Sequence, residues 1–102
     1  MSAWKDKLDN GEILLIDGAM GTELERRGVP MSAISWSGTS LVENPEEIIA
    51  AHEDYIRAGA EVIITNTFGV GPYLLEELGY ADRVDELIRS AGELAQRARD
   101  NV

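Results

Sequence analysis

The segment "ILLIDGAMG" places four aliphatic residues, Ile13 to Ile16, directly before an aspartate and a glycine-containing turn. An aliphatic run without alternation is typical of a strand that is buried on both faces of a parallel sheet. A second segment, "EVIITNT" at residues 61–67, is rich in β-branched residues and also ends in polar ones. The sequence therefore predicts two strands, over residues 12–17 and 61–67.

A strong helix signal lies between these two segments. Asn44 is suited to be an N-cap and Pro45 to be the first helical residue, apolar residues recur at helical spacing after them, and Gly59 is a natural stop. We expect a helix over residues 45–58. A strand, a helix and a strand in this order predict a right-handed parallel crossover.

The remaining helices are predicted from weaker or more local patterns. Apolar residues recur with a helical period from about residue 82 to residue 98. Thr22 followed by Glu25 matches a capping box and predicts a short helix that ends near Gly28. We expect further short helical pieces at residues 5–10 and 74–78, and a loop over residues 29–42 in which Trp36 needs a partner surface.

Two strands with their helices are fewer than any closed α/β architecture needs. We therefore predict an α/β chain that forms the N-terminal βαβα segment of a (β/α)8 TIM barrel, incomplete as given, or part of an open sheet. The 102 residues suit one small domain or a piece of one. Self-association or a second, completing chain would supply the missing strands.

The composition excludes several classes of function. A formal net charge of −10 repels phosphate backbones and anionic lipid, so we expect no nucleic-acid partner. No apolar run reaches the length of a membrane span or a signal core, and we expect a cytoplasmic protein without a membrane partner. Cysteine is absent, which excludes disulfides, a thiolate nucleophile and thiolate-based zinc sites within these residues.

Both predicted strands end in polar or small residues. In parallel α/β folds ligands bind beyond the carboxyl ends of the strands. The carboxylate of Asp17 suits an ammonium group, and small residues after it let backbone amides approach a carboxylate or phosphate. The candidate binding residues are Asp17, Gly18, Ala19, Met20, Gly21, Thr65, Asn66 and Thr67. An equally weighted alternative is that Asp17 only caps the following turn.

No catalytic or metal-ligating set can be assembled from the other polar residues. His52 lies on the apolar face of the helix predicted over residues 45–58, and we interpret it as a core histidine. No second histidine and no cysteine accompanies it, so no metal site is predicted in this chain.

Three blocks of the sequence resemble the beginning of the homocysteine S-methyltransferase family. They are "IDGAMGTELERRG", "ENPEEIIAAHEDYIRAGAEVIITNTFG" and "GYADRVDELIRSAGELAQRARD", and they cover nearly the whole chain. The resemblance is greatest to the homocysteine-binding domain of cobalamin-dependent methionine synthases, and more distant to betaine-homocysteine methyltransferase. It implies a (β/α)8 barrel in which a zinc ion held by three cysteines activates the homocysteine thiol for methyl transfer, which forms methionine.

The resemblance also implies roles for the candidate residues. Asp17 is similar to the aspartate that binds the homocysteine amino group, with the backbone of residues 18–21 near the substrate carboxylate and residues 65–67 in the pocket. The zinc cysteines lie on later strands that these residues do not include. Zinc is therefore expected in the complete domain, no cofactor is expected in this chain, and residues 1–102 are expected to be a partial, inactive homocysteine-binding domain.

Two alternatives remain open at the level of sequence. The first is a non-catalytic α/β module that pairs with itself or with a second chain to complete a sheet. The second is an unrelated small α/β domain that binds an anionic metabolite through the glycine-containing turn. The blocks downstream of that turn count against the second alternative.

Overall fold

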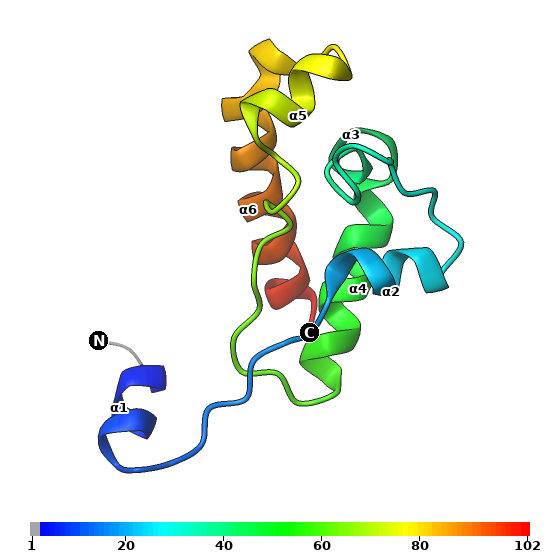
Figure 1. Cartoon of the computed structure of the whole chain (residues 1–102). Helices are drawn as coiled ribbons and strands as arrows, with labels where there is room; N and C mark the ends of the chain where they lie inside the picture. The colour runs from blue at the N-terminus through cyan, green and yellow to red at the C-terminus, as the bar shows by residue number, and fades with distance from the viewer. Residues whose placement is uncertain (1–2) are drawn as a thin grey trace.

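The computed structural model describes residues 3–102 as a set of helices joined by extended segments (Figure 1). The elements in chain order are α1 (Ala3–Asp9), α2 (Met20–Arg26), α3 (Ser40–Glu43), α4 (Pro45–Arg57), α5 (Pro72–Glu77), the 3-10 helix η1 (Ala81–Arg83) and α6 (Val84–Asn101).

The core lies where α4 packs against α6, and α2 and α3 each pack against α4 as well (Figure 1). Leu24 of α2, Ile48 of α4 and Leu87 of α6 are among its buried side chains. Helix α1 stands apart from this body and has no buried residue. None of the helices in residues 3–102 combines the length and the apolar composition that a membrane span requires.

The main helices confirm the sequence patterns that predicted them. Helix α4 begins at Pro45 after Asn44 in the N-cap position, although the Asn44 side chain makes no capping hydrogen bond. Gly59 follows with a φ of 117°, a left-handed conformation that glycine adopts without a steric penalty, and the helix ends there. Helix α6 carries the predicted apolar stripe, with Leu87, Ala91 and Leu94 buried.

The two predicted strands are not formed as strands within residues 3–102. The segments run in parallel but share a single isolated bridge, between Ile16 and Val62. Backbone N–H groups of Asp17 and Glu61 donate to the carbonyls of Val62 and Leu15 at 3.0 and 2.8 Å. The parallel direction agrees with the expected crossover. A pair of parallel segments with no further strand beside it has too few ladder bonds to extend the pairing.

Burial of the first segment on both faces was also a wrong expectation. Ile13 is 88% exposed, and Leu15, Ile16 and Ile64 are each more than half exposed. Leu15 and Ile16 are adjacent in an extended segment and so point to opposite faces, and both are exposed. These side chains are therefore open to the further strands that a parallel sheet would place beside and against them.

Two local predictions are wrong for a different reason. Helix α2 begins at Met20 after the N-cap Ala19, so Thr22 lies inside the helix and the capping box does not form. The stretch predicted as a loop over residues 29–42 contains the start of α3, and Ser40 and Leu41 of that helix are buried. Neither helix has a side-chain capping bond at its N-cap, so the capping patterns that the sequence offers do not define these helix starts.

Candidate functional site

The single bridge brings the two predicted ligand-binding segments together. Asp17 follows Ile16 at one end of the bridge, and residues 64–67 follow Val62 at the other. The backbone N–H of Ile64 donates to Asp17 Oδ2 at 3.0 Å. The Asp17 side chain is thus bonded across the bridge to the second segment, 47 positions away in the chain, and not to the turn that follows it.

The other carboxylate oxygen of Asp17 is free. Within residues 3–102, Oδ1 is buried and has no hydrogen-bond partner. An unpaired buried acceptor costs free energy, of about 1–3 kcal/mol or more for a charged group. The side chain is therefore fixed through one oxygen and keeps an unsatisfied acceptor on the other.

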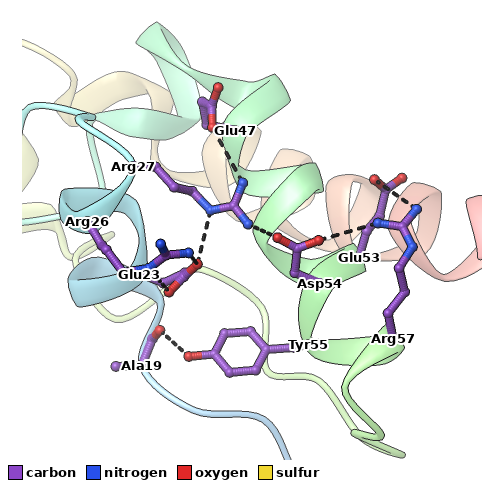
Figure 2. Close-up of polar contacts among 9 residues, drawn as sticks. All are labelled: Ala19, Glu23, Arg26, Arg27, Glu47, Glu53, Asp54, Tyr55 and Arg57. Atoms are coloured by element: carbon purple, nitrogen blue, oxygen red, sulfur yellow. Dashed lines mark hydrogen bonds and ion pairs between the residues drawn. The ribbon is translucent and has the colours of Figure 1, made fainter.

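The loop after Asp17 is held from behind by α4. Tyr55 Oη donates to the carbonyl oxygen of Ala19 at 2.7 Å (Figure 2). Gly18 packs on the same ring, since a Cβ atom placed there would lie 3.0 Å from Tyr55 Oη. In the described part of the chain, the backbone N–H groups of Gly18 and Ala19 have no backbone acceptor.

The second polar segment is fixed by a partner that the sequence did not reveal. Asn66 is 3% exposed; its Oδ1 accepts from Ser37 Oγ at 2.7 Å and its Nδ2 donates to the Ser37 carbonyl at 3.0 Å. Both ends of the amide are thus satisfied by one residue of the 29–42 stretch. Thr65 and Thr67 face each other, with their Oγ1 atoms 3.2 Å apart.

These segments surround a cavity of about 330 Å³. Its lining contains six of the eight candidate residues, namely Gly18, Ala19, Met20, Gly21, Thr65 and Asn66. Asp17 and Thr67 are not in the lining, although Asp17 precedes Gly18 in the chain and is bonded to the lining residue Ile64. Sequence reasoning missed the rest of the lining, which is Thr22, Trp36, Ser37, Ile64 and Phe68.

Trp36 and Phe68 form one wall of this cavity. Their rings stack with centroids 5.3 Å apart and an interplanar angle of 8°. Trp36 has a φ of 53°, which is unusual for a residue with a side chain. The sequence indicated that Trp36 needs a partner surface if it is to be buried; its ring stacks on Phe68 but remains 56% exposed, and nothing local pointed to Phe68.

His52 is a core residue of α4, as its position on the apolar face predicted. It is fully buried, and neither ring nitrogen has a partner within residues 3–102. Burial lowers the pKa of His52, and the nearby Asp17 carboxylate partly opposes this shift. The imidazole is therefore neutral at pH 7.

Residues 3–102 do not contain the side-chain cluster that a metal centre needs. No group of three or more His, Cys, Asp or Glu side chains in residues 3–102 could hold a metal ion, and the sequence contains no cysteine. A metal-dependent step would need ligands other than these residues.

Comparison with known proteins identifies the family. The family model described as Homocysteine S-methyltransferase matches residues 14–102. The chain belongs to the homocysteine S-methyltransferase family. The match includes both polar segments and the helices α2 to α6 that hold them in place.

Individual members of the family support the same assignment. A homocysteine S-methyltransferase of Escherichia coli (strain K12) is 46% identical over 99 residues, which are 91% of this chain and 30% of that protein. A selenocysteine Se-methyltransferase of Brassica oleracea is 34% identical over 92 residues, which are 89% of this chain and 27% of that protein. The chain thus spans about a third of the length of the curated relatives it matches.

A solved structure agrees with the helical arrangement. The crystal structure of the homocysteine methyltransferase of Escherichia coli in its metallated form superimposes with a TM-score of 0.80 at 42% sequence identity. The match covers 98% of this chain and 35% of that one. The fold described above is therefore that of one part of a family member.

Proposed function

We propose that residues 1–102 are the N-terminal part of a homocysteine-binding (β/α)8 barrel that transfers a methyl group to the homocysteine thiol. In this barrel they bind the amino and carboxylate groups of the substrate. In this proposal Asp17 binds the substrate amino group, the backbone at residues 18–21 lies near the substrate carboxylate, and residues 65–67 border the pocket. The observation that supports it most is that Asp17, whose Oδ1 has no hydrogen-bond partner within residues 3–102, precedes Gly18 and is bonded to Ile64, both of which line the cavity.

The arrangement supports recognition of both ends of an amino acid. A carboxylate oxygen without a donor suits an ammonium group, and backbone N–H groups without acceptors suit a carboxylate. The Asp17 carboxylate and the N–H groups of Gly18 and Ala19 belong to adjacent residues. The ammonium and carboxylate groups of an amino acid are likewise close together, because both are bonded to its α-carbon. The side chain of the ligand would then extend along the cavity, past the Trp36 and Phe68 wall.

The remainder of the chemistry is assigned to residues outside this chain. Activation of a thiol requires a group that stabilises the thiolate, and residues 3–102 contain no cysteine and no cluster of three or more side chains that could hold a metal ion. In the proposal, zinc belongs to the complete domain, and residues 1–102 alone bind homocysteine weakly and do not methylate it.

The test uses a completed barrel, in which residues 1–102 are joined to the part of the Escherichia coli homocysteine S-methyltransferase that follows the matched segment. Asp17→Asn keeps an oxygen that can accept from the Ile64 N–H but removes the charge. We expect homocysteine binding to weaken by about 1.5–3 kcal/mol, ten- to a hundredfold, with an unchanged melting temperature and zinc content.

Asp17→Ala is the companion variant. It removes the bond to Ile64 as well as the charge, so we expect the same loss of affinity together with a stability loss on the order of 1 kcal/mol. Homocysteine affinity that both variants leave intact, with stability lowered in Asp17→Ala, would show that Asp17 is structural and would overturn the proposed role.

A second candidate function is supported by the exposed aliphatic face. Ile13, Leu15, Ile16 and Ile64 are all at least half exposed, and such a face favours association with another chain. In this alternative the chain is a non-catalytic module that pairs with itself or with a completing chain. Its mass in solution distinguishes the two: a stable dimer that the completed barrel does not form favours the module.

A further inference from the structure

Tyr55 connects α4 to the loop that follows Asp17. Its hydroxyl donates to the carbonyl oxygen of Ala19 at 2.7 Å, and Figure 2 shows the ring reaching from α4 to the chain just before α2. Ala19 is the N-cap of α2 and lines the cavity. The phenol therefore fixes the orientation of the peptide group that joins Ala19 to Met20.

The same ring restricts the preceding residue. A Cβ atom at Gly18 would lie 3.0 Å from Tyr55 Oη, 3.3 Å from Cε1 and 3.4 Å from Cζ. Only the glycine backbone fits at this distance without a shift of the ring. Tyr55 thus contacts two successive residues of the loop, both of which line the cavity, without being part of the lining itself.

The helix that carries Tyr55 is itself fixed relative to α2. Arg27 at the end of α2 pairs with Asp54, the residue before Tyr55, and with Glu47, which also belongs to α4 (Figure 2). Burial, followed by the nearby Glu23 and Asp17 carboxylates, raises the pKa of Tyr55, so the phenol keeps its proton as a donor at neutral pH.

We infer that Tyr55 is a positioning residue for the substrate carboxylate: it holds in one conformation the backbone of residues 18–20, which line the cavity and in which the Gly18 and Ala19 N–H groups have no backbone acceptor. This inference rests on the proposed function, since it assigns a cause to the geometry of the same site. In this inference Tyr55 acts through the loop, since its hydroxyl already donates to the Ala19 carbonyl and its side chain is not part of the cavity lining.

The test is Tyr55→Phe in the completed barrel, with Tyr73→Phe as the matched control because Tyr73 is 86% exposed. Loss of one hydrogen bond that orders the site corresponds to about a 3- to 10-fold weaker homocysteine affinity. We expect this loss in KM and in the dissociation constant for homocysteine, with an unchanged KM for the methyl donor and unchanged zinc content. Tyr73→Phe should leave all four quantities unchanged.

Gly18→Ala provides a second, independent variant. Its added Cβ meets Tyr55 Oη first, so it should push the phenol away from Ala19 and weaken homocysteine binding. In a Tyr55→Phe background that contact is gone, and we expect the second substitution to cost clearly less than it does alone. Strictly additive effects would overturn the inference, as would a Tyr55→Phe variant that lowers the melting temperature but binds homocysteine normally.

Asp17→Asn in the same barrel distinguishes a failure of the positioning role of Tyr55 from a failure of the proposed substrate site. If Asp17→Asn weakens homocysteine binding and Tyr55→Phe does not, the positioning role is wrong and the proposed function stands. If neither variant changes the affinity, the site assignment itself is wrong and the inference fails with it.

Discussion

Arg27 joins α2 to α4 and offers a direct test of how the two helices are held together. Its guanidinium is only 17% exposed, and it lies 3.1 Å from Glu23 and 3.8 Å from Glu47 and contacts Asp54 (Figure 2). Arg27→Met keeps the length and apolar stem of the side chain and removes the charge. Glu47 and Asp54 would then face α2 without their shared cation.

The cost lies between two limits. Removing one partner of a fully buried ion pair costs about 3–5 kcal/mol, whereas exposed pairs contribute about 0–1 kcal/mol. Arg27 is mostly buried, but the Glu47 and Asp54 side chains are 45% and 53% exposed, so solvent screens them in part. We therefore expect Arg27→Met to lower the free energy of unfolding by about 1–3 kcal/mol.

The neighbouring arginine is the control. The Arg26 side chain is 69% exposed and pairs with Glu23 alone, within α2, so Arg26→Met should change stability much less. The assay is urea denaturation of the 102-residue chain, followed by circular dichroism, for both variants and the parent. An Arg27→Met variant that is as stable as Arg26→Met would refute the role of Arg27 as the link between α2 and α4.

Two further predictions concern acid stability and metal content. The Arg26 hydrogen bond lowers the pKa of Glu23 to about 2 from its usual 4.5, and Arg27 adds to the shift. Ionised Glu23 therefore stabilises the fold above pH 4.5, and this contribution is lost as the pH falls from 4.5 to about 2. Over this pH range the melting temperature of the parent should fall more than that of the Glu23→Gln variant. Purified chain should also bind zinc no better than other acidic proteins, so stoichiometric zinc with sub-micromolar affinity would contradict our assignment of the metal to residues outside it.

The helices were predictable where the signal is local. Asn44, Pro45 and Gly59 define the ends of α4 through capping and backbone preferences that act within a few residues. The apolar period of α6 is equally local. The two predicted strands did not form, because a parallel strand is stable only when other strands lie beside it. The prediction from the aliphatic runs took those neighbouring strands to be present.

The candidate site was predictable only in part for a related reason. A polar residue at the end of an aliphatic run pointed to Asp17, and small residues pointed to the loop after it. The pairing of Asn66 with Ser37 joins residues 29 positions apart, and no local pattern encodes it. The same holds for the bond from Tyr55 to Ala19, across 36 positions, which required the packing of α4 against the loop.

The measurement that tests the central claim most directly compares two ligands on the completed barrel. L-homocysteine and 4-sulfanylbutanoate share the thiol and the carboxylate, and only homocysteine carries the amino group. If Asp17 binds that group, the parent should prefer homocysteine by about ten- to a hundredfold, and Asp17→Asn should reduce the preference to near unity. An Asp17→Asn barrel that keeps the full preference would contradict the account.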